Sequence, residues 1–224
     1  MEKPIKKRAP INGDGRLRPL FPNSRIQSPG AYLDQYAVEV AAALASIDRA
    51  EFDLAVAILE DALKRDATIF TCGNGGSAAI ANHMVCDHQK GIHADTELRP
   101  KVVSLSSNVE VVTAVSNDIG FADVFAFPLN LHGRSGDVLV TVSSSGNSEN
   151  VVRAIEAAAR LGMETIALTG FDGGRSRQMA TAAIHVDGWN YGVIEDAHQA
   201  CMHVMAQFLR LRVIPEELLG HRRF

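Results

Sequence analysis

The chain has 224 residues, a formal net charge of -4 and a pI of about 6.1, values that do not favour a general binder of nucleic acid or of membrane surfaces. Its length fits one large domain, and no apolar run is long enough to span a bilayer. The three cysteines, Cys72, Cys86 and Cys201, are too few and too scattered for a disulfide framework. We therefore expect the protein to work in a reducing compartment, the cytoplasm.

The first 30 residues differ in composition from the rest of the chain. They contain seven lysines or arginines, two acids and five prolines, and they lack the apolar stretch of a signal peptide. Because proline interrupts helices, we predict a basic, proline-containing arm over residues 1–30 and a single domain over residues 31–224. A solvated tail is a simpler interpretation of this arm than a partner-binding segment.

Residues 31–65 have the periodicity of two helices. Tyr32 and Tyr36 begin an apolar pattern at helical spacing. Asp48, followed three residues later by Glu51, matches a capping box and marks the start of a second helix. Two helices are thus expected before the first strand.

The remainder of the chain alternates strands and helices. Short apolar runs bounded by turn residues predict strands, and longer amphipathic segments predict helices. This alternation predicts a three-layer α/β fold, with a mostly parallel five-stranded sheet between helices on both faces. The expected strands cover residues 68–72, 102–105, 137–142, 165–168 and 183–186, and the expected helices cover residues 77–89, 109–116, 124–131, 148–161 and 194–211.

Two loops of small residues each follow a strand and open a helix. They read CGNGGS at residues 72–77 and SSSGNS at residues 143–148. In a parallel sheet such loops lie at the carboxyl edge, where ligands bind. Hydroxyl groups and the free amides of a helix start form a neutral set of donors suited to a phosphate monoester, although ordinary turn and cap chemistry uses the same residues. The candidate phosphate and substrate ligands are Asn74, Gly75, Ser77, Ser143, Ser144, Ser145 and Ser148.

The first loop also matches a loose dinucleotide-binding pattern, with Gly73, Gly75 and Ala78 at the expected spacing. That interpretation requires an acid at the end of the next strand, where this sequence has residues 104–107, Ser-Leu-Ser-Ser. It also leaves the serine-rich loop unexplained. No Gly-Lys-Ser/Thr motif is present, which excludes a P-loop nucleotide site.

A second candidate site combines histidines and acids. His83 and Asp87 are four residues apart on one predicted helix, and Glu195 and His203 are eight apart on the last. If the two helices meet, two imidazoles and two carboxylates would suit Zn²⁺ or a similar divalent ion. Such pairs also occur on helix surfaces without a metal. Cys86 and His198 are further candidate ligands close by in the sequence.

Four motifs together resemble the phosphoheptose isomerase family of sugar isomerase (SIS) domain proteins. These are the two loops above, SNDIGF at residues 116–121 and ALTGFDGG at residues 167–174, and the likeness covers residues 68–210. The resemblance implies conversion of sedoheptulose 7-phosphate to D-glycero-D-manno-heptose 7-phosphate, the first step toward the heptose of bacterial lipopolysaccharide. It also implies a zinc-containing homotetramer, which we expect to have its sites at subunit contacts. By motif position, phosphate would be bound by Ser77, Ser143, Ser145 and Ser148, and the metal and reacting carbons would be surrounded by His83, Asp87, Glu195 and His203.

The sequence departs from the family pattern in its acids. The resemblance implies glutamate at position 87, glutamine at 195 and aspartate near 192, where this chain has Asp87, Glu195 and Gly192. We expect aldose–ketose isomerisation through an enediol, with Asp87 or Glu195 as the base and His203 as the acid. The shorter reach of Asp87 favours Glu195 as the base.

Two other functions are compatible with the sequence. The chain could isomerise another sugar phosphate, because nothing in the motifs counts the carbons of the sugar. It could also be a non-catalytic SIS protein that binds a protein partner, as the DnaA initiator-associating type does. The retained histidines and acids favour the enzyme over the binding protein.

Overall fold

The computed structural model describes residues 20–224, so the predicted basic arm at residues 1–30 lies largely outside the described part of the chain. Its last two residues, Pro29 and Gly30, already belong to a helix. Proline is well tolerated there because the first helical N–H has no partner inside the helix. No helix in residues 20–224 is long and apolar enough to cross a membrane.

Two helices precede the sheet, as predicted: α1 (Pro29–Ala45) and α2 (Arg49–Lys64). Asp48 caps α2 by accepting a hydrogen bond from the N–H of Ala50 at 2.8 Å. Glu51 does not complete the capping box. Its carboxylate instead accepts a hydrogen bond from the N–H of Ala183 at 2.8 Å, which ties α2 to the last strand of the sheet.

The sheet has five strands in the order β2-β1-β3-β4-β5, and every neighbouring pair is parallel. The predicted five-stranded sheet is confirmed. A fully parallel sheet requires a crossover between successive strands, and helices supply each crossover. The strands are β1 (Thr68–Gly73), β2 (Lys101–Ser104), β3 (Val138–Ser143), β4 (Glu164–Thr169) and β5 (Ala182–His185).

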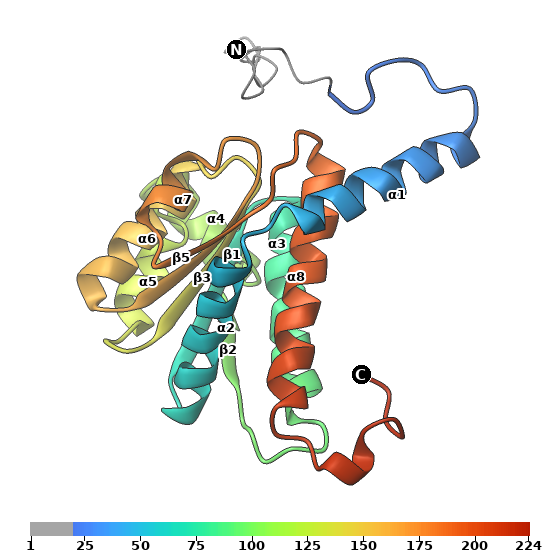
Figure 1. The fold of residues 1–224 in the computed structure, drawn as a ribbon. Coiled ribbons are helices and arrows are strands. Elements are labelled where there is room, and N and C mark those ends of the chain that lie inside the picture. The colour runs from blue at the N-terminus through green and yellow to red at the C-terminus, as the bar shows by residue number, and fades with distance from the viewer. Residues whose placement is uncertain (1–19) are drawn as a thin grey trace.

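Helices cover both faces of the sheet and produce the predicted three layers (Figure 1). Successive residues of β3 point to opposite faces, so Val138 and Val140 join one hydrophobic cluster while Leu139 joins the other. The first cluster packs beneath α2 and α8, and the second beneath α5 and α6. The remaining helices are α3 (Gly76–Cys86), α4 (Val109–Asp118), α5 (Ala126–His132), α6 (Glu149–Leu161), α7 (Gly174–Met179) and α8 (Tyr191–Leu211), with short 3₁₀ turns η2 (Phe121–Asp123) and η3 (Glu216–Leu218).

The helices differ from the predictions at three places, apart from boundary shifts of one or two residues. The helix expected over residues 77–89 ends at Cys86 and continues as a π-helix, η1 (Asp87–Ile92). Helix α7 was not predicted, because its six residues have no apolar periodicity. Helix α8 begins three residues early, because the side chain of Asn190 accepts a hydrogen bond from the N–H of Val193 at 3.2 Å.

The topology brings the two small-residue loops together. The first follows β1 and the second follows β3, and these strands are neighbours in the sheet. The chain leaves β1 toward β2 on one side, whereas β3 and the later strands lie on the other side. The loops therefore flank the point where the strand order reverses, the usual binding crevice of open parallel sheets.

Two of the described histidines are fully buried. His88 in η1 has one ring nitrogen 3.1 Å from the carbonyl oxygen of Met84, and His198 in α8 has one 3.1 Å from the carbonyl oxygen of Thr169. The other ring nitrogen of each histidine has no hydrogen-bond partner. Burial lowers the pKa of both side chains to about 4, because an added proton would create a buried, unpaired charge.

We expect the free energy of unfolding to fall as the pH is lowered from about 6.5, the pKa of an unfolded histidine, toward 4. In this window the unfolded chain binds protons that the folded chain excludes, and each buried histidine contributes about 3 kcal/mol to the loss. Urea unfolding at a series of pH values measures the dependence.

A matched pair of variants assigns the effect. His198→Gln keeps a donor for the Thr169 carbonyl group but does not titrate, so it is expected to remove about half of the pH dependence and leave the part due to His88. His132→Gln, at an exposed position of α5, is expected to leave it unchanged. Identical pH dependences for the two variants would contradict the role of His198.

Candidate active site

The serine-rich loop and the glycine-rich loop form the walls of a cavity of about 190 Å³. Six of the seven predicted phosphate and substrate residues line it, and the exposed Gly75, in the turn that opens α3, does not. Among the described residues, those lining this cavity include no lysine, arginine or histidine. The lining therefore combines uncharged donors of the predicted kind with one carboxylate, and it is formed by Asn74, Ser77, Val142, Ser143, Ser144, Ser145, Ser148, Tyr191 and Glu195.

Two hydroxyl groups of the loop are not used by the fold itself. Ser148 occupies the position before the first residue of α6, yet its side chain makes no capping hydrogen bond. Ser144 is only 5% exposed, and its hydroxyl group has no partner. A buried hydroxyl without a partner is costly, so a site that leaves one free is suited to a ligand that accepts hydrogen bonds. Ordinary turn and cap chemistry accounts for neither side chain.

Backbone packing holds the serine loop in place. Gly146 has φ +61°, and a Cβ atom there would lie 1.9 Å from the carbonyl oxygen of Gly173. A Cβ atom on Gly174 would in turn lie 2.6 Å from the carbonyl oxygen of Ser145. The paired glycines of the ALTGFDGG motif thus let the segment that opens α7 pack directly against the loop.

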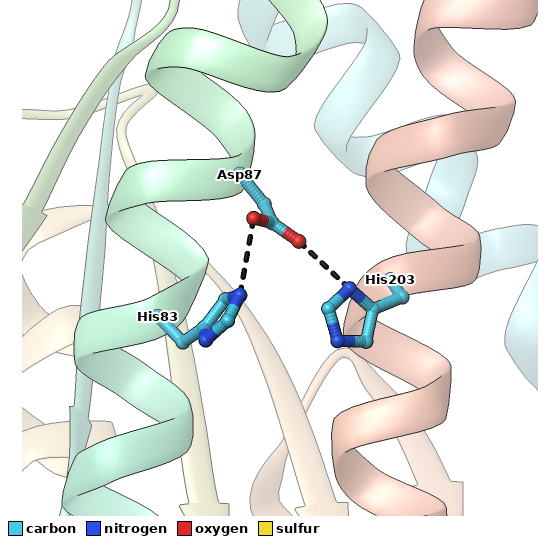
Figure 2. Close-up of side chains that lie close together, drawn as sticks. All are labelled: His83, Asp87 and His203. Carbon is cyan, nitrogen blue, oxygen red and sulfur yellow. Dashed lines mark ion pairs between the residues drawn. The ribbon is translucent and has the colours of Figure 1, made fainter. Parts of the chain in front are cut away.

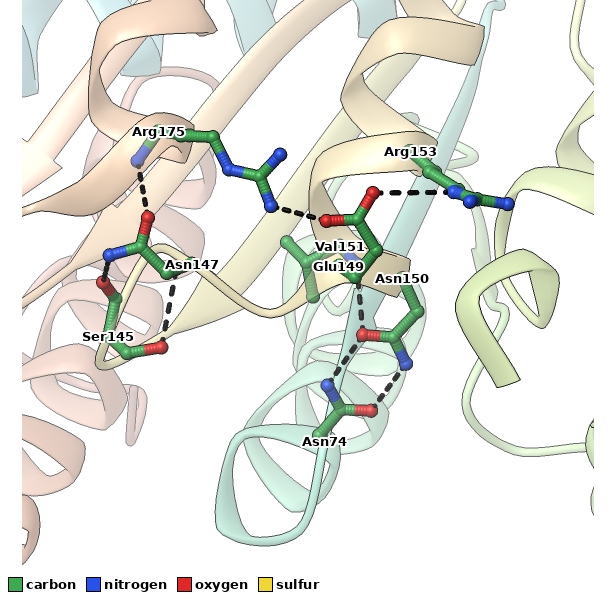
Figure 3. A network of polar contacts seen from close by, with 8 residues as sticks. All are labelled: Asn74, Ser145, Asn147, Glu149, Asn150, Val151, Arg153 and Arg175. Atoms are coloured by element: carbon green, nitrogen blue, oxygen red, sulfur yellow. Dashed lines mark hydrogen bonds and ion pairs between the residues drawn. The ribbon is translucent and has the colours of Figure 1, made fainter. Parts of the chain in front are cut away.

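Charged side chains brace the outer side of the loop (Figure 3). The N–H of Arg175 donates to the side-chain oxygen of Asn147 at 3.1 Å, and its guanidinium group forms an ion pair with Glu149. Arg153 extends this chain of charges, with ion pairs to Glu149 at 3.4 Å and to Asp123 at 2.8 Å. The network connects α7, the start of α6 and η2. Each of these side chains is exposed to solvent by about a third or more, so we treat the network as a brace rather than a large source of stability.

His83, Asp87 and His203 form the second part of the site (Figure 2). One carboxylate oxygen of Asp87 lies 3.1 Å from His83 Nε2, and the other lies 2.8 Å from His203 Nδ1. The side-chain nitrogen of Gln199 lies 2.8 Å from His203 Nε2 and orients that ring. One ligand atom of each of the three residues falls within 4.8 Å of the other two. Helices α3 and α8 run side by side and bring these side chains together (Figure 1).

Glu195, predicted as a fourth ligand, is not a member of this group of ligand atoms. Its carboxylate lies at the start of α3, where a Cβ atom on Gly76 would be 2.5 Å from Glu195 Oε2. Helix geometry explains the placement. Eight residues of α-helix advance about 12 Å and turn through about two and a quarter revolutions, so Glu195 and His203 point in directions about 80° apart. Glu195 faces the serine cavity, and His203 faces Asp87.

The surroundings of Glu195 raise its pKa. Partial burial is the main cause, and the neighbouring Asp196 carboxylate adds to it. Asp196 accepts a hydrogen bond from the hydroxyl group of Tyr36 on α1 at 2.7 Å. Tyr36 also fills the space beside Gly192, where a Cβ atom would lie 2.8 Å from its oxygen. The Tyr36 side chain thus occupies the space that a side chain at position 192 would need.

A larger cavity of about 620 Å³ opens beside the histidines. Asp87 and His203 line one side, and Lys90, Arg210 and the C-terminal Phe224 line the other. Cys86, a candidate ligand from the sequence, also lines this cavity but is not among the three clustered ligands. His198, the other candidate, is fully buried and bonded to the backbone of β4.

Two residues of the serine cavity region were missed in the sequence. Tyr191 lines the cavity, with its ring 4.7 Å from that of Phe171, but the last helix was predicted to begin after it. Asn150 is 2% exposed and bonded to Asn74, whereas its place in the first turn of a predicted amphipathic helix gave no sign of burial. A polar residue that follows a ligand-binding loop by two positions is the only signal that could have marked it.

Comparison with known proteins places this arrangement in a defined class. The sequence profile of the SIS domain matches residues 32–170. The chain is 37% identical over 151 residues to the phosphoheptose isomerase of Rhodospirillum rubrum, covering 67% of this chain and 80% of that protein. The corresponding enzyme of Vibrio parahaemolyticus is 37% identical over 162 residues, covering 71% of this chain and 83% of that protein.

Solved structures agree with the sequence comparison. The phosphoheptose isomerase of Neisseria gonorrhoeae superposes with a TM-score of 0.73 at 33% identity, covering 80% of this chain and 95% of that one. The enzyme of Francisella tularensis has the same TM-score at 28% identity, covering 81% of this chain and 96% of that one. The protein has the SIS fold of sugar-phosphate isomerases. Within that class, the chain belongs to the phosphoheptose isomerase family.

Proposed function

We propose that the protein interconverts the aldose and ketose forms of a phosphorylated sugar, with sedoheptulose 7-phosphate as the substrate. The observation that carries the proposal is that α8 and the helical segment of α3 and η1 each supply side chains both to the serine cavity and to the His–Asp–His cluster. Names of relatives at 37% identity support the same substrate. An isomerase acting on another sugar phosphate is the second candidate, because the serine cavity would bind the phosphate group whatever the length of the sugar.

The serine cavity would hold the phosphate group. Ser143, Ser145 and Ser148 would donate hydroxyl hydrogens, and the unpartnered hydroxyl group of Ser144 would gain an acceptor. The first N–H groups of α6 add the partial positive charge of a helix start. Together these donors would offset the phosphate charge without a cationic side chain in the cavity lining.

The His–Asp–His cluster would hold a divalent ion, and zinc suits it best. Two imidazole nitrogens and a carboxylate oxygen are common zinc ligands, and three protein ligands leave a position for an oxygen of the substrate. Asp87 and the two histidines are partly exposed, with side-chain exposures from 25% to 47%, so the site is open to solvent. When bound, such an ion would supply Lewis-acid chemistry by drawing electron density from an oxygen of the substrate.

Glu195 would be the base. It is the only carboxylate among the residues lining the serine cavity, and no ion pair of the described residues involves it. Its raised pKa brings its proton affinity closer to neutral pH, where a base in isomerisation works best. It would take a proton from the carbon beside the carbonyl group and return it to the carbonyl carbon, while the proton of the adjacent hydroxyl group moves to the former carbonyl oxygen. His203, predicted both as the acid and as a metal ligand, would be one of the three metal ligands, and its role as the acid stays a prediction.

The test of the proposed activity is direct. Purified protein incubated with sedoheptulose 7-phosphate is expected to form an aldose heptose 7-phosphate, detected by NMR as a new anomeric signal. Ribulose 5-phosphate and fructose 6-phosphate are the matched alternatives. Turnover of one of these but not of sedoheptulose 7-phosphate would support the second candidate, an isomerase of another sugar phosphate. Turnover of none of the three would refute the proposed isomerase activity.

Replacing Asp87 by asparagine is expected to weaken binding of the divalent ion by more than about tenfold, since even groups that support metal ligands contribute this much. Asp87 contacts both histidines, so it is the residue that connects the cluster. Elemental analysis after purification without chelators measures the metal content. Asp53→Asn, at an exposed position of α2, is the control and is expected to keep the parent metal content. Equal metal content in both variants would reject the cluster as the metal site.

We also propose that the protein is a homotetramer with its sites at subunit contacts. Leu33 and Val38 on α1 are 65% and 67% exposed, and α1 extends beyond the sheet (Figure 1). Apolar side chains exposed together on one helix are typical of a surface that another chain covers. Light scattering at micromolar concentration is expected to give four times the monomer mass, and a Leu33→Glu/Val38→Glu variant a smaller one. A parent protein that is monomeric would contradict this assembly.

A further inference from the structure

The two ligand-binding loops are joined by a pair of asparagines (Figure 3). The side-chain nitrogen of Asn74 donates to the oxygen of Asn150 at 2.9 Å, and the nitrogen of Asn150 donates to the oxygen of Asn74 at 2.8 Å. Asn74 belongs to the glycine-rich loop after β1, and Asn150 to the first turn of α6 after the serine-rich loop. A reciprocal amide pair fixes both the distance and the relative tilt of the two side chains, which a single hydrogen bond does not.

The orientation of this pair is set from one side. The N–H of Val151 donates to the side-chain oxygen of Asn150 at 3.0 Å. Because a backbone N–H can only donate, the oxygen of Asn150 must face it, and the nitrogen must then face Asn74. Asn150 in turn determines which atom of the Asn74 amide pairs with it. The backbone of α6 thus fixes the orientation of the Asn150 amide, and Asn150 fixes that of the Asn74 amide.

The two asparagines differ in their burial and in their access to the serine cavity. Asn150 is 2% exposed and does not line the serine cavity, whereas Asn74 is half-buried and does. After pairing, Asn74 retains a second N–H and a second acceptor position for a ligand. The side-chain oxygen of Asn150 accepts two hydrogen bonds, and its nitrogen donates one to Asn74.

We propose that Asn150 is a positioning residue that holds Asn74 in the orientation that binds the sugar phosphate. Asn74 touches the ligand, and Asn150 acts only through Asn74. The inference rests on the proposed function in that a sugar phosphate occupies the serine cavity, but it does not depend on which sugar is isomerised.

A double-variant cycle tests the proposal with the full-length protein. Binding of sedoheptulose 7-phosphate is measured by calorimetry for the parent, Asn74→Ala, Asn150→Ala and the double variant. Each single variant is expected to weaken binding about tenfold, the effect of losing one hydrogen bond to a charged ligand. The double variant is expected to be no more than about twofold weaker than Asn74→Ala alone, because Asn150 then has nothing left to position. Asn130→Ala, at an exposed position of α5, is the control.

A second variant guards against misfolding at the buried position. Asn150→Asp keeps the size of the side chain and the acceptor for the N–H of Val151, but it removes the donor to Asn74. In the parent background it is expected to weaken binding at least as much as Asn150→Ala. In the Asn74→Ala background the loss is expected to disappear, and a loss that persists there would count against the positioning role.

The outcomes separate this inference from the proposed function. The positioning role would be overturned if the double variant lost as much affinity as the product of the two single losses, or if Asn150→Ala bound the sugar phosphate as well as the parent. Neither result would affect the proposed isomerase activity. A parent protein that binds the sugar phosphate but does not isomerise it would reject the proposed function and leave the cycle decisive. A parent protein that binds no sugar phosphate would overturn both.

Discussion

Replacing Glu195 by glutamine is expected to lower kcat by about 10²–10⁴-fold, the usual contribution of a general base, while the purified protein keeps its metal. The amide has nearly the same size and lies in the same place against Gly76, but it cannot take up a proton. Metal is expected to remain because Glu195 is not part of the cluster of His83, Asp87 and His203. Steady-state kinetics and elemental analysis of the same preparation measure both results.

Two further variants make the assignment of the base sharper. The family resemblance implies glutamate at 87 and glutamine at 195, so Asp87→Glu combined with Glu195→Gln moves the acid rather than removing it. This double variant is expected to recover activity over Glu195→Gln alone. Gly76→Ala is expected to lower kcat without loss of stability, because its methyl group would displace the Glu195 carboxylate and alanine is favourable in a helix. Full activity of Glu195→Gln would instead identify Asp87 as the base.

Replacing Gly146 by alanine is expected to destabilise the protein by about 3 kcal/mol or more, a cost typical of strain in a packed backbone. Its φ of +61° is unfavourable for alanine, and its Cβ atom would lie 1.9 Å from the carbonyl oxygen of Gly173. Since that neighbour is backbone, relief requires the serine loop or the start of α7 to move. Phosphate binding is expected to be lost with stability. Urea unfolding and calorimetry with inorganic phosphate measure the two effects.

Gly220 provides the matched control for the conformational part of this effect. Its φ is +77°, but nothing lies within 4 Å of a Cβ atom placed there. Gly220→Ala is therefore expected to cost only the strain of the left-handed conformation, about 1 kcal/mol. A Gly146→Ala protein as stable as Gly220→Ala would show that the contact with Gly173 is easily relieved.

Local sequence pattern was sufficient to predict the layers, the five strands and the two small-residue loops at the ends of β1 and β3. Apolar runs specify strands because alternate residues must enter the two cores, as Val138 and Leu139 do. Part of the cluster of His83, Asp87 and His203 could also be predicted, because His83 and Asp87 are four apart and so share a helix face. The meeting of this face with His203 required the packing of α3 on α8, which spacing alone does not reveal.

The remaining features depend on tertiary packing. The π-helix that begins at Asp87 has no sequence signal, since its residues are ordinary helix formers apart from Gly91. The pairing of Asn150 with Asn74 joins residues 76 positions apart, beyond any local pattern. The separation of Glu195 from His203 was predictable in principle, but grouping residues at steps of four ignores the 40° drift that each step adds.

Helix α8 runs without interruption from Tyr191 to Leu211, and it carries Glu195 near one end and His203 in the middle. The distance between the proposed base and the proposed metal site is therefore fixed by the number of helical residues between Glu195 and His203, since no loop lies between them. Deleting one residue between them would rotate one group by about 100° relative to the other and shorten their separation by about 1.5 Å. The same deletion after Leu211 would leave both in register. Evolution can exchange side chains along this segment, but it can change the segment's length only by rebuilding the site.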